Sequence, residues 1–205
     1  MIAFLHTSDI HIERFEQLAR KFDEAVKIKH FVHEELLDYA LREGATDNQG
    51  FASAVQSIKE ERPELIICTC STYGEVCDQR NDIERIDQPV VEYLVSRYNK
   101  IGLAYTANST KQVSHDLIVK TAQEQNREVV IVDCDCSSAW VHYESNDLDQ
   151  YAKVITERLK TYAAEVDVIF LAQASMEHAK SYLADFSKDI YASPEFGVKS
   201  YLSRS

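Results

Sequence analysis

The feature that most constrains this chain of 205 residues is an internal repeat. Residues 2–7 (IAFLHT) resemble residues 101–106 (IGLAYT), at an offset of 99 positions. Residues 64–72 resemble residues 167–175, at an offset of 103 positions. Two similar offsets, each close to half the chain, predict two related halves of about 100 residues rather than one mid-sized domain.

Short apolar runs alternate with amphipathic stretches through both halves. The apolar runs are nearly continuous and rich in Val and Ile, which is typical of strands buried in a parallel sheet. They cover residues 2–7, 26–32, 65–70, 101–106, 129–133 and 168–172. The amphipathic stretches predict helices over residues 14–22, 34–42, 51–61, 90–98, 112–124 and 148–164. This alternation predicts an α/β fold: two pseudo-symmetric three-layer α/β halves with mainly parallel sheets and an active-site cleft between them.

The junction between the halves is expected near Asn99, between a predicted helix and the strand that opens at Ile101. We therefore assign residues 1–98 to the first half and residues 99–187 to the second. The last segment, residues 188–205, is expected to pack back on the first half.

Composition restricts the partners. The chain has 22 Lys+Arg against 34 Asp+Glu, a net charge of −12, so we expect no nucleic acid and no anionic membrane as a partner. The first residues lack the basic start and long apolar run of a signal peptide, so we expect a cytoplasmic protein with reduced cysteines. A homo-oligomer is left open.

Small polar residues follow four of the predicted strands. The positions are Thr7 and Ser8; Cys70, Ser71 and Thr72; Thr106, Ser109 and Thr110; and Gln173 and Ser175. Ligands of open parallel sheets gather at the carboxyl ends of the strands, and helix N-termini offer donors there, so these positions favour a small carboxylate ligand. The alternative is that each residue only caps the helix that follows it.

Cys70 is the candidate for chemistry, because it ends a buried strand just before a predicted helix start. The positive end of the helix dipole is expected to lower the pKa of its thiol toward neutrality. The alternative is a packed core thiol, since free cysteine is often buried. His6 and His11, beside the end of the first strand, are weaker candidates to line the site.

Metal and nucleotide chemistry find little support. Cys68 with Cys70, and Cys134 with Cys136, form two C-x-C pairs, but the C-x₂-C spacing of common zinc sites is absent. The P-loop, the dinucleotide fingerprint and the serine-nucleophile elbow are absent as well. We predict no metal and no cofactor.

Taken together, the two halves and the segments around Cys70 and residues 172–176 (AQASM) resemble the aspartate/glutamate/hydantoin racemase superfamily. The resemblance spans almost the whole chain. It implies chemistry in which two cysteines, one from each half, act on opposite faces of a carbon next to a carboxylate. The first cysteine position corresponds to Cys70, with Ser71 and Thr72 where the family binds the substrate carboxylate. The second corresponds to Gln173.

Gln173 departs from the family pattern, because an amide does not titrate and therefore cannot serve as acid or base. The chemistry that remains needs one cysteine: decarboxylation of a malonate-like acid with protonation from one face, or cis–trans isomerisation through a cysteine adduct. The family's decarboxylases keep the second-half cysteine instead, so this chain is their mirror case. Gln173 is expected to donate a hydrogen bond to an enediolate oxygen.

The sequence thus predicts an isomerase of the racemase type, or a related lyase, that acts next to the carboxylate of a small acid. Cys70 would be the acid/base or nucleophile. The expected substrate-binding residues are Thr7, Ser8, Ser71, Thr72, Thr106, Ser109, Thr110, Gln173, Ala174 and Ser175. The alternative is a small-carboxylate-binding protein of the same fold without catalysis.

Overall fold

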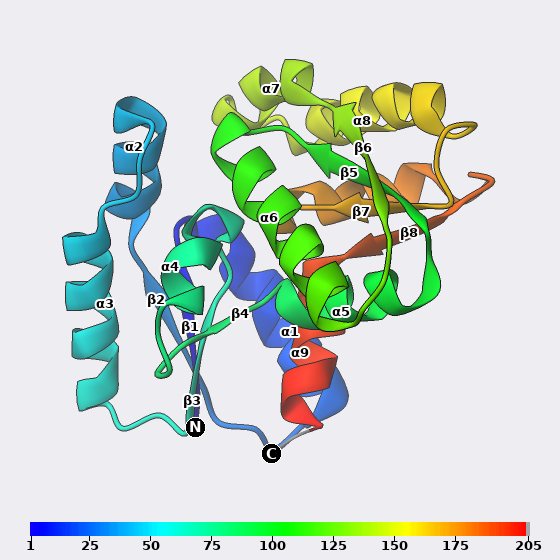
Figure 1. Ribbon diagram of the computed structural model, residues 1–205. Coiled ribbons are helices and arrows are strands. Elements are labelled where there is room, and N and C mark those ends of the chain that lie inside the picture. Colours follow the sequence, from blue (N-terminus) through cyan, green and yellow to red (C-terminus); the bar gives the residue numbers. More distant parts are fainter. Residues whose placement is uncertain (204–205) are drawn as a thin grey trace. The chain divides into compact units, whose positions relative to one another are not determined.

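The computed structural model describes residues 1–203 and divides into two compact units (Figure 1). Unit 1 comprises Met1–Asp87 with the C-terminal segment from Pro194, and unit 2 comprises Gln88–Ser193. Each unit contains a four-stranded parallel sheet with helices on both faces. The predicted α/β class with two parallel-sheet halves is confirmed.

Unit 1 has the strand order β2-β1-β3-β4. Its strands are β1 (Ile2–His6), β2 (Ile28–Val32), β3 (Leu65–Cys68) and β4 (Glu84–Arg85). Successive side chains of a strand point to opposite faces of the sheet. Ala3 and Leu5 of β1 therefore pack with one set of helices, α2 (Glu34–Glu43), α3 (Asn48–Glu60) and α4 (Gly74–Asp78). Phe4 faces the other side, against Phe15 of α1 (Ile12–Phe22).

Unit 2 repeats this arrangement with the order β6-β5-β7-β8. Its strands are β5 (Lys100–Tyr105), β6 (Val130–Asp135), β7 (Val168–Leu171) and β8 (Asp189–Ala192). One face packs against α8 (Leu148–Tyr162) and the 3-10 segment η4 (Ala174–Tyr182). The remaining helices are α5 (Gln88–Arg97), α6 (Asn108–Glu124) and α7 (Trp140–Glu144). Short 3-10 turns, η1 (Asp9–His11), η2 (Ser71–Tyr73) and η3 (Ser137–Ala139), complete the two units.

The equivalent strand orders account for the sequence repeat, since β1 and β3 correspond to β5 and β7. Unit 2 begins earlier, at Gln88 rather than residue 99, and ends later, at Ser193 rather than residue 187, than we assigned from sequence. α5, placed in the first half from sequence, lies in unit 2, where the Gln125 amide donates to the carbonyl of Glu92. β8 also lies in unit 2, paired with β7.

The C-terminal helix α9 (Ser193–Leu202) packs on unit 1, next to the end of β4. The Tyr201 hydroxyl donates to the carbonyl of Arg85 over 2.8 Å. Gly197 permits the close approach, because a Cβ atom there would lie 2.3 Å from the carbonyl oxygen of Ile86.

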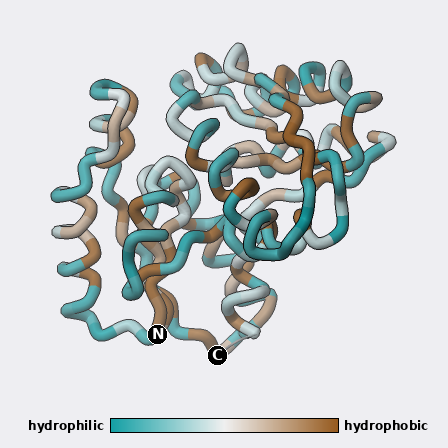
Figure 2. The backbone as a smooth tube through the Cα atoms, viewed as in Figure 1, coloured by the Kyte–Doolittle hydropathy of each residue, from teal (hydrophilic) through white to brown (hydrophobic). Residues whose placement is uncertain are grey.

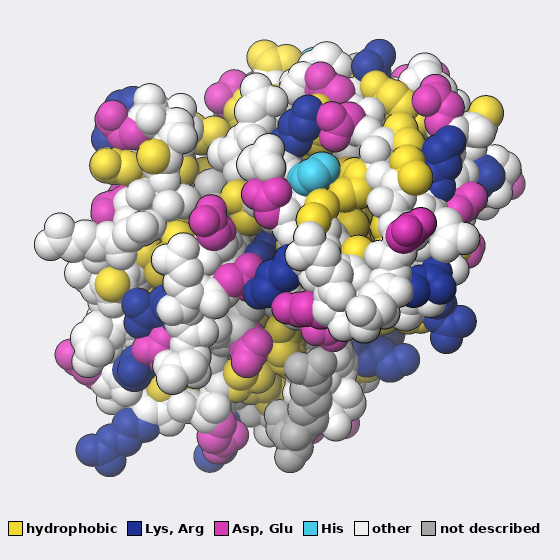
Figure 3. Space-filling view, in the orientation of Figure 1, with side chains coloured by type: hydrophobic (Ala, Val, Ile, Leu, Met, Phe, Trp, Pro, Cys, Tyr) yellow, Lys and Arg dark blue, Asp and Glu magenta, His cyan; other side chains and the backbone are white. Residues whose placement is uncertain are grey.

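Hydropathy follows this layering. Figure 2 shows the most hydrophobic backbone along the sheet strands and more hydrophilic segments along the outer helices and loops. On the face shown in Figure 3, acidic and basic side chains are interspersed, with apolar side chains between them. Within the described residues, no helix is long and apolar enough to span a membrane.

Candidate functional site: two strand-end clusters

The first cluster lies at the carboxyl edge of the unit 1 sheet. Thr7 and Ser8 follow β1, and Cys70, Ser71 and Thr72 follow β3, which is the neighbour of β1. Cys70 and Ser8 are partly exposed, whereas the other three are buried. Parallel pairing of adjacent strands therefore brings together all the residues that the sequence predicted for this half.

Helix capping does not explain these residues. Ser8 and Cys70 occupy the N-cap positions of η1 and η2, yet neither side chain makes a capping hydrogen bond. The side chain of Thr7 instead hydrogen-bonds the Cys70 thiol, and so do the backbone N–H and the side chain of Thr72. The cluster is therefore organised around the sulfur atom.

The expected lowering of the Cys70 pKa is wrong. Burial raises the pKa of the Cys70 thiol to about 11, and the nearby Cys68 adds to the rise. The hydrogen bonds from Thr7 and Thr72 oppose this shift without overcoming it. The helical stretch after Cys70 is short, since η2 and α4 end at Asp78, so its dipole is weak against the loss of solvation. Cys70 is thus a neutral thiol at neutral pH.

A buried chain of hydrogen bonds supports the same two strand ends from the opposite face of the sheet. Nδ1 of His6 lies 2.8 Å from the Thr69 hydroxyl, and Nε2 of His6 lies 2.8 Å from Nδ1 of His30. Nε2 of His30 lies 3.1 Å from Glu16 on α1. His6 is fully buried, and burial lowers its pKa to about 2, so its ring is neutral and does not line the site.

The second cluster lies at the carboxyl edge of the unit 2 sheet, where Thr106 follows β5 and Gln173 follows β7. Oε1 of Gln173 accepts three hydrogen bonds: from the backbone N–H of Thr106 over 2.7 Å, from the Thr106 hydroxyl over 3.0 Å, and from the N–H of Ala107 over 3.1 Å. The side chain of Gln173 therefore occupies the backbone donors that we had expected Thr106 to offer to a ligand.

The other predicted residues of this half surround the same edge. Ala174 and Ser175 begin η4 and are partly exposed, while Ser109 and Thr110 lie in the first turn of α6. The structure thus gathers each predicted set at the edge of its own sheet.

Tyr151 is a member of the second cluster that the sequence did not predict. Its side chain comes from α8 and is fully buried, with the hydroxyl 2.9 Å from Thr106 Oγ1 and 3.0 Å from Ser175 Oγ. Burial raises the pKa of this phenol. In the sequence Tyr151 reads as one of the apolar positions of an amphipathic helix, so no local signal distinguished it.

The remaining cysteines belong to the cores of the two units. Cys68 and Cys77 are buried in unit 1, and Cys134 and Cys136 are buried in unit 2. Burial raises the pKa of each unit 2 thiol to about 12. Among the residues that the structure describes, no group of three or more His, Cys, Asp or Glu side chains is placed to hold a metal ion.

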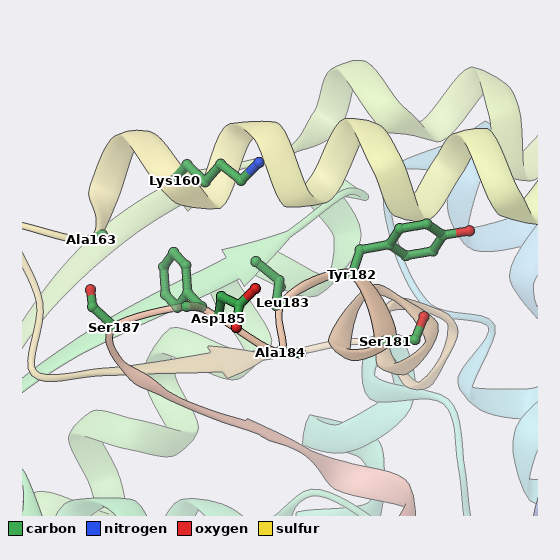
Figure 4. A pocket seen from close by; sticks show the side chains of 9 residues that line it. Lys160, Ala163, Ser181, Tyr182, Leu183, Ala184, Asp185 and Ser187 are labelled. Atoms are coloured by element: carbon green, nitrogen blue, oxygen red, sulfur yellow. The ribbon is translucent and has the colours of Figure 1, made fainter.

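A separate open groove of about 540 Å³ lies in unit 2, between the end of α8 and the chain that leads from η4 to β8 (Figure 4). Lys160 and Ala163 line one side, and residues 181–187 line the other. The groove contains none of the predicted site residues.

Comparison with known proteins places the chain among solved folds but not among sequence families. No protein-family model and no curated protein matches its sequence. Solved structures match over almost its whole length. The aspartate racemase of Picrophilus torridus superposes with a TM-score of 0.77 at 15% identity, covering 99% of this chain and 93% of that one.

Two further matches agree. The glutamate racemase of Francisella tularensis gives a TM-score of 0.77 at 13% identity, covering 99% of this chain and 80% of that one. The allantoin racemase of Klebsiella pneumoniae gives a TM-score of 0.66 at 13% identity, covering 98% of this chain and 86% of that one. At such identities the similarity shows the fold alone, and this chain shares that fold with aspartate, glutamate and allantoin racemases.

Proposed function

We propose that this chain is an enzyme that acts, without a cofactor, at the carbon next to the carboxylate of a small acid, with Cys70 as the proton donor. The observation that carries the proposal is the environment of the Cys70 sulfur. The residue lies at the carboxyl edge of a parallel sheet and is partly exposed. Hydrogen bonds from Thr7 and Thr72 also reach its sulfur.

The raised pKa of Cys70 favours one of the roles that the sequence left open. With a pKa of about 11, only about 10⁻⁴ of the molecules carry a thiolate at pH 7. Removal of a proton and nucleophilic attack both require the thiolate, whereas donation of a proton requires the thiol. Proton donation is therefore the role that this environment favours.

Decarboxylation of a malonate-like acid uses such a donor. When the bond to one carboxylate breaks, CO₂ leaves and the electron pair remains on the α-carbon as an enediolate. The Cys70 thiol then transfers its proton to that carbon, and Thr7 and Thr72 stabilise the resulting thiolate until solvent returns a proton. Gln173 cannot titrate, so a two-base racemisation that uses this position is disfavoured.

The donors beside Cys70 are proposed to hold the substrate carboxylate. Ser8 and Ser71 stay predicted carboxylate-binding residues at the same sheet edge as the thiol, whereas the backbone N–H and side chain of Thr72 contact the Cys70 sulfur. Ser109, Thr110, Ala174 and Ser175 stay predicted substrate-binding residues, and Gln173 is treated below. Thr106 is now assigned to the positioning of Gln173, because its backbone N–H and its hydroxyl both donate to Oε1 of Gln173.

The test is turnover, and deuterium incorporation at the α-carbon in D₂O, over a panel of amino acids, hydantoins and substituted malonates. The names of the similar structures, which are aspartate, glutamate and allantoin racemases, justify the first two classes. Cys70→Ser should abolish both signals. Cys77→Ala, which alters a buried cysteine of the same unit, is the control for folding. Undiminished turnover in Cys70→Ser would end the proposal.

A second candidate, a carboxylate-binding protein without catalysis, is favoured by one observation: the end of β7 carries the amide of Gln173, which cannot titrate, where the resemblance implies a second cysteine. A binding protein would show ligand-induced thermal stabilisation with no turnover and no deuterium exchange, and this outcome separates the two candidates.

A further inference from the structure

We propose that the end of β7 in unit 2 recognises its ligand with a fixed hydrogen-bond polarity, in which Gln173 donates, Ser175 accepts, and the buried Tyr151 sets this order. The inference deepens the proposed function and rests on it, since it concerns the same small acid. It narrows the chemical class of that acid to compounds with a carbonyl or carboxylate oxygen and, beside it, an N–H or O–H group, such as a malonate-like acid with an amino or hydroxyl group on its α-carbon.

The orientation of the Gln173 amide is determined by its partners. The two backbone N–H groups of Thr106 and Ala107 can only donate, so the atom that they contact must be the amide oxygen. Gln173 is only 8% exposed, but its amide nitrogen is not among the completely buried polar atoms without a partner, so this nitrogen reaches the surface. Gln173 therefore presents N–H donors outward.

The order of the hydroxyl protons follows from that oxygen. The Thr106 hydroxyl donates its single proton to Oε1 of Gln173, so Thr106 Oγ1 must accept from Tyr151. Tyr151 has then used its proton and must accept from Ser175, 3.0 Å away. Each hydroxyl carries one proton, so the direction of the whole chain is fixed from one end.

Ser175 is thereby left with lone pairs and no free proton. It is partly exposed, two residues after Gln173 on the same strand end. A ligand that reaches both residues must offer an acceptor to Gln173 and a donor to Ser175. An acid with only carboxylate oxygens would place an acceptor against the lone pairs of Ser175, which is unfavourable.

Tyr151 is the specificity-determining residue of this arrangement, although it does not reach the ligand. Its side chain is fully buried, and it fixes the hydroxyl of Ser175 as a donor to the interior. Tyr151→Phe removes that acceptor, so the proton of Ser175 becomes free to turn toward a ligand oxygen. The preference for a ligand with a donor group should then disappear.

The experiment measures binding by calorimetry in the full-length Cys70→Ser protein, with two matched pairs of probes. The pairs are L-aspartate with succinate, and L-glutamate with glutarate, which differ by one amino group. We expect the amino acid of at least one pair to bind about tenfold more tightly than its partner, as for one hydrogen bond to a charged group.

Three variants and one control separate this explanation from others. Tyr151→Phe and Ser175→Ala should each bring the affinity ratio of the pair close to one. Gln173→Glu keeps an oxygen for Thr106 and Ala107 but replaces the outward N–H group with an anion, and should weaken both ligands of the pair at least about tenfold. Tyr162→Phe, on the same helix, should leave the ratio unchanged.

An unchanged ratio in Tyr151→Phe, no preference in the parent protein, or no binding of any probe would each overturn the inference. Binding in the Cys70→Ser protein is independent of turnover. If Cys70→Ser keeps its activity while the affinity ratios behave as expected, the assignment of Cys70 fails and the polarity of the Gln173 edge stands.

Discussion

At the scale of single residues, Cys70 shows how burial can outweigh a helix N-terminus. The position of the residue between strand and helix is correct in the sequence prediction, but the stabilisation that a helix N-terminus gives to an anion is modest and acts only within the first turn. Here the helical stretch ends at Asp78, while dense packing removes water from the sulfur. The consequence is a thiol suited to give a proton rather than to take one.

This environment predicts the reactivity of the cysteines. Cys70 is the partly exposed one of the five, so iodoacetamide should label it alone in the folded protein. Its rate should rise about tenfold for each pH unit up to the pKa of about 11, because only the thiolate reacts.

Thr7→Val should slow this labelling about tenfold at any pH below 11, because the hydrogen bond from Thr7 favours the thiolate. Mass spectrometry of labelled peptides measures both effects, and Thr46→Val, at an exposed hydroxyl of the same unit, is the control. Fast labelling of Cys70 at pH 7 would contradict the raised pKa.

At the scale of elements, α6 carries buried hydroxyls that the fold does not satisfy. The hydroxyl oxygens of Ser114 and Thr121 are buried and have no hydrogen-bond partner within the described residues. In α8, by contrast, the buried Thr156 hydroxyl donates to the carbonyl of Ala152 over 2.9 Å. An unpartnered buried hydroxyl costs free energy, whereas a bonded one does not.

Isosteric substitution should reveal this difference. Thr121→Val is expected to leave the free energy of unfolding unchanged or to raise it by about 1 kcal/mol, because it removes an unsatisfied polar group. Thr156→Val should lower it by about 1 kcal/mol, because it removes a bonded one. Urea unfolding of both variants measures the contrast, and equal effects would contradict it.

The short edge strands β4 and β8 were missed from sequence for a physical reason. β4 consists of Glu84 and Arg85 alone, and β8 has only three apolar residues after Asp189, so neither shows the long apolar run of a buried strand. Both pair on one side only, and there charged residues are tolerated. Their place in the sheet is set by the partners β3 and β7 rather than by their own composition.

At the scale of the whole molecule, the two units share one topology and differ in their titratable interiors. Burial lowers the pKa of His6 to about 2 and that of His11 to about 4, and both residues lie in unit 1. Below pH 6.5 the unfolded chain protonates these histidines and the folded unit does not, so unfolding is increasingly favoured as the pH falls.

Lowering the pH from 7 to 5 should therefore cost unit 1 about 2 kcal/mol for each of the two histidines. The single tryptophan, Trp140, lies in unit 2, so its fluorescence follows that unit while far-UV circular dichroism follows both. On acidification the dichroism midpoint in urea should fall more than the fluorescence midpoint, and His11→Gln should recover part of the difference. Equal falls of the two midpoints would contradict the conclusion that buried His6 and His11 destabilise unit 1 at low pH.

The sequence by itself determined the two-fold repeat, the parallel α/β class and the strand ends at which Cys70 and Gln173 stand, because these depend on local periodicity and on positions along the chain. It also showed that Gln173 cannot titrate. Three features depend on the tertiary structure alone. They are the protonation state of Cys70, the hydrogen bonds from Thr106 and Ala107 to Oε1 of Gln173, and the contact of the Tyr151 hydroxyl with Ser175. Desolvation and hydrogen-bond direction depend on groups far apart in the chain, and folding alone brings these groups into contact.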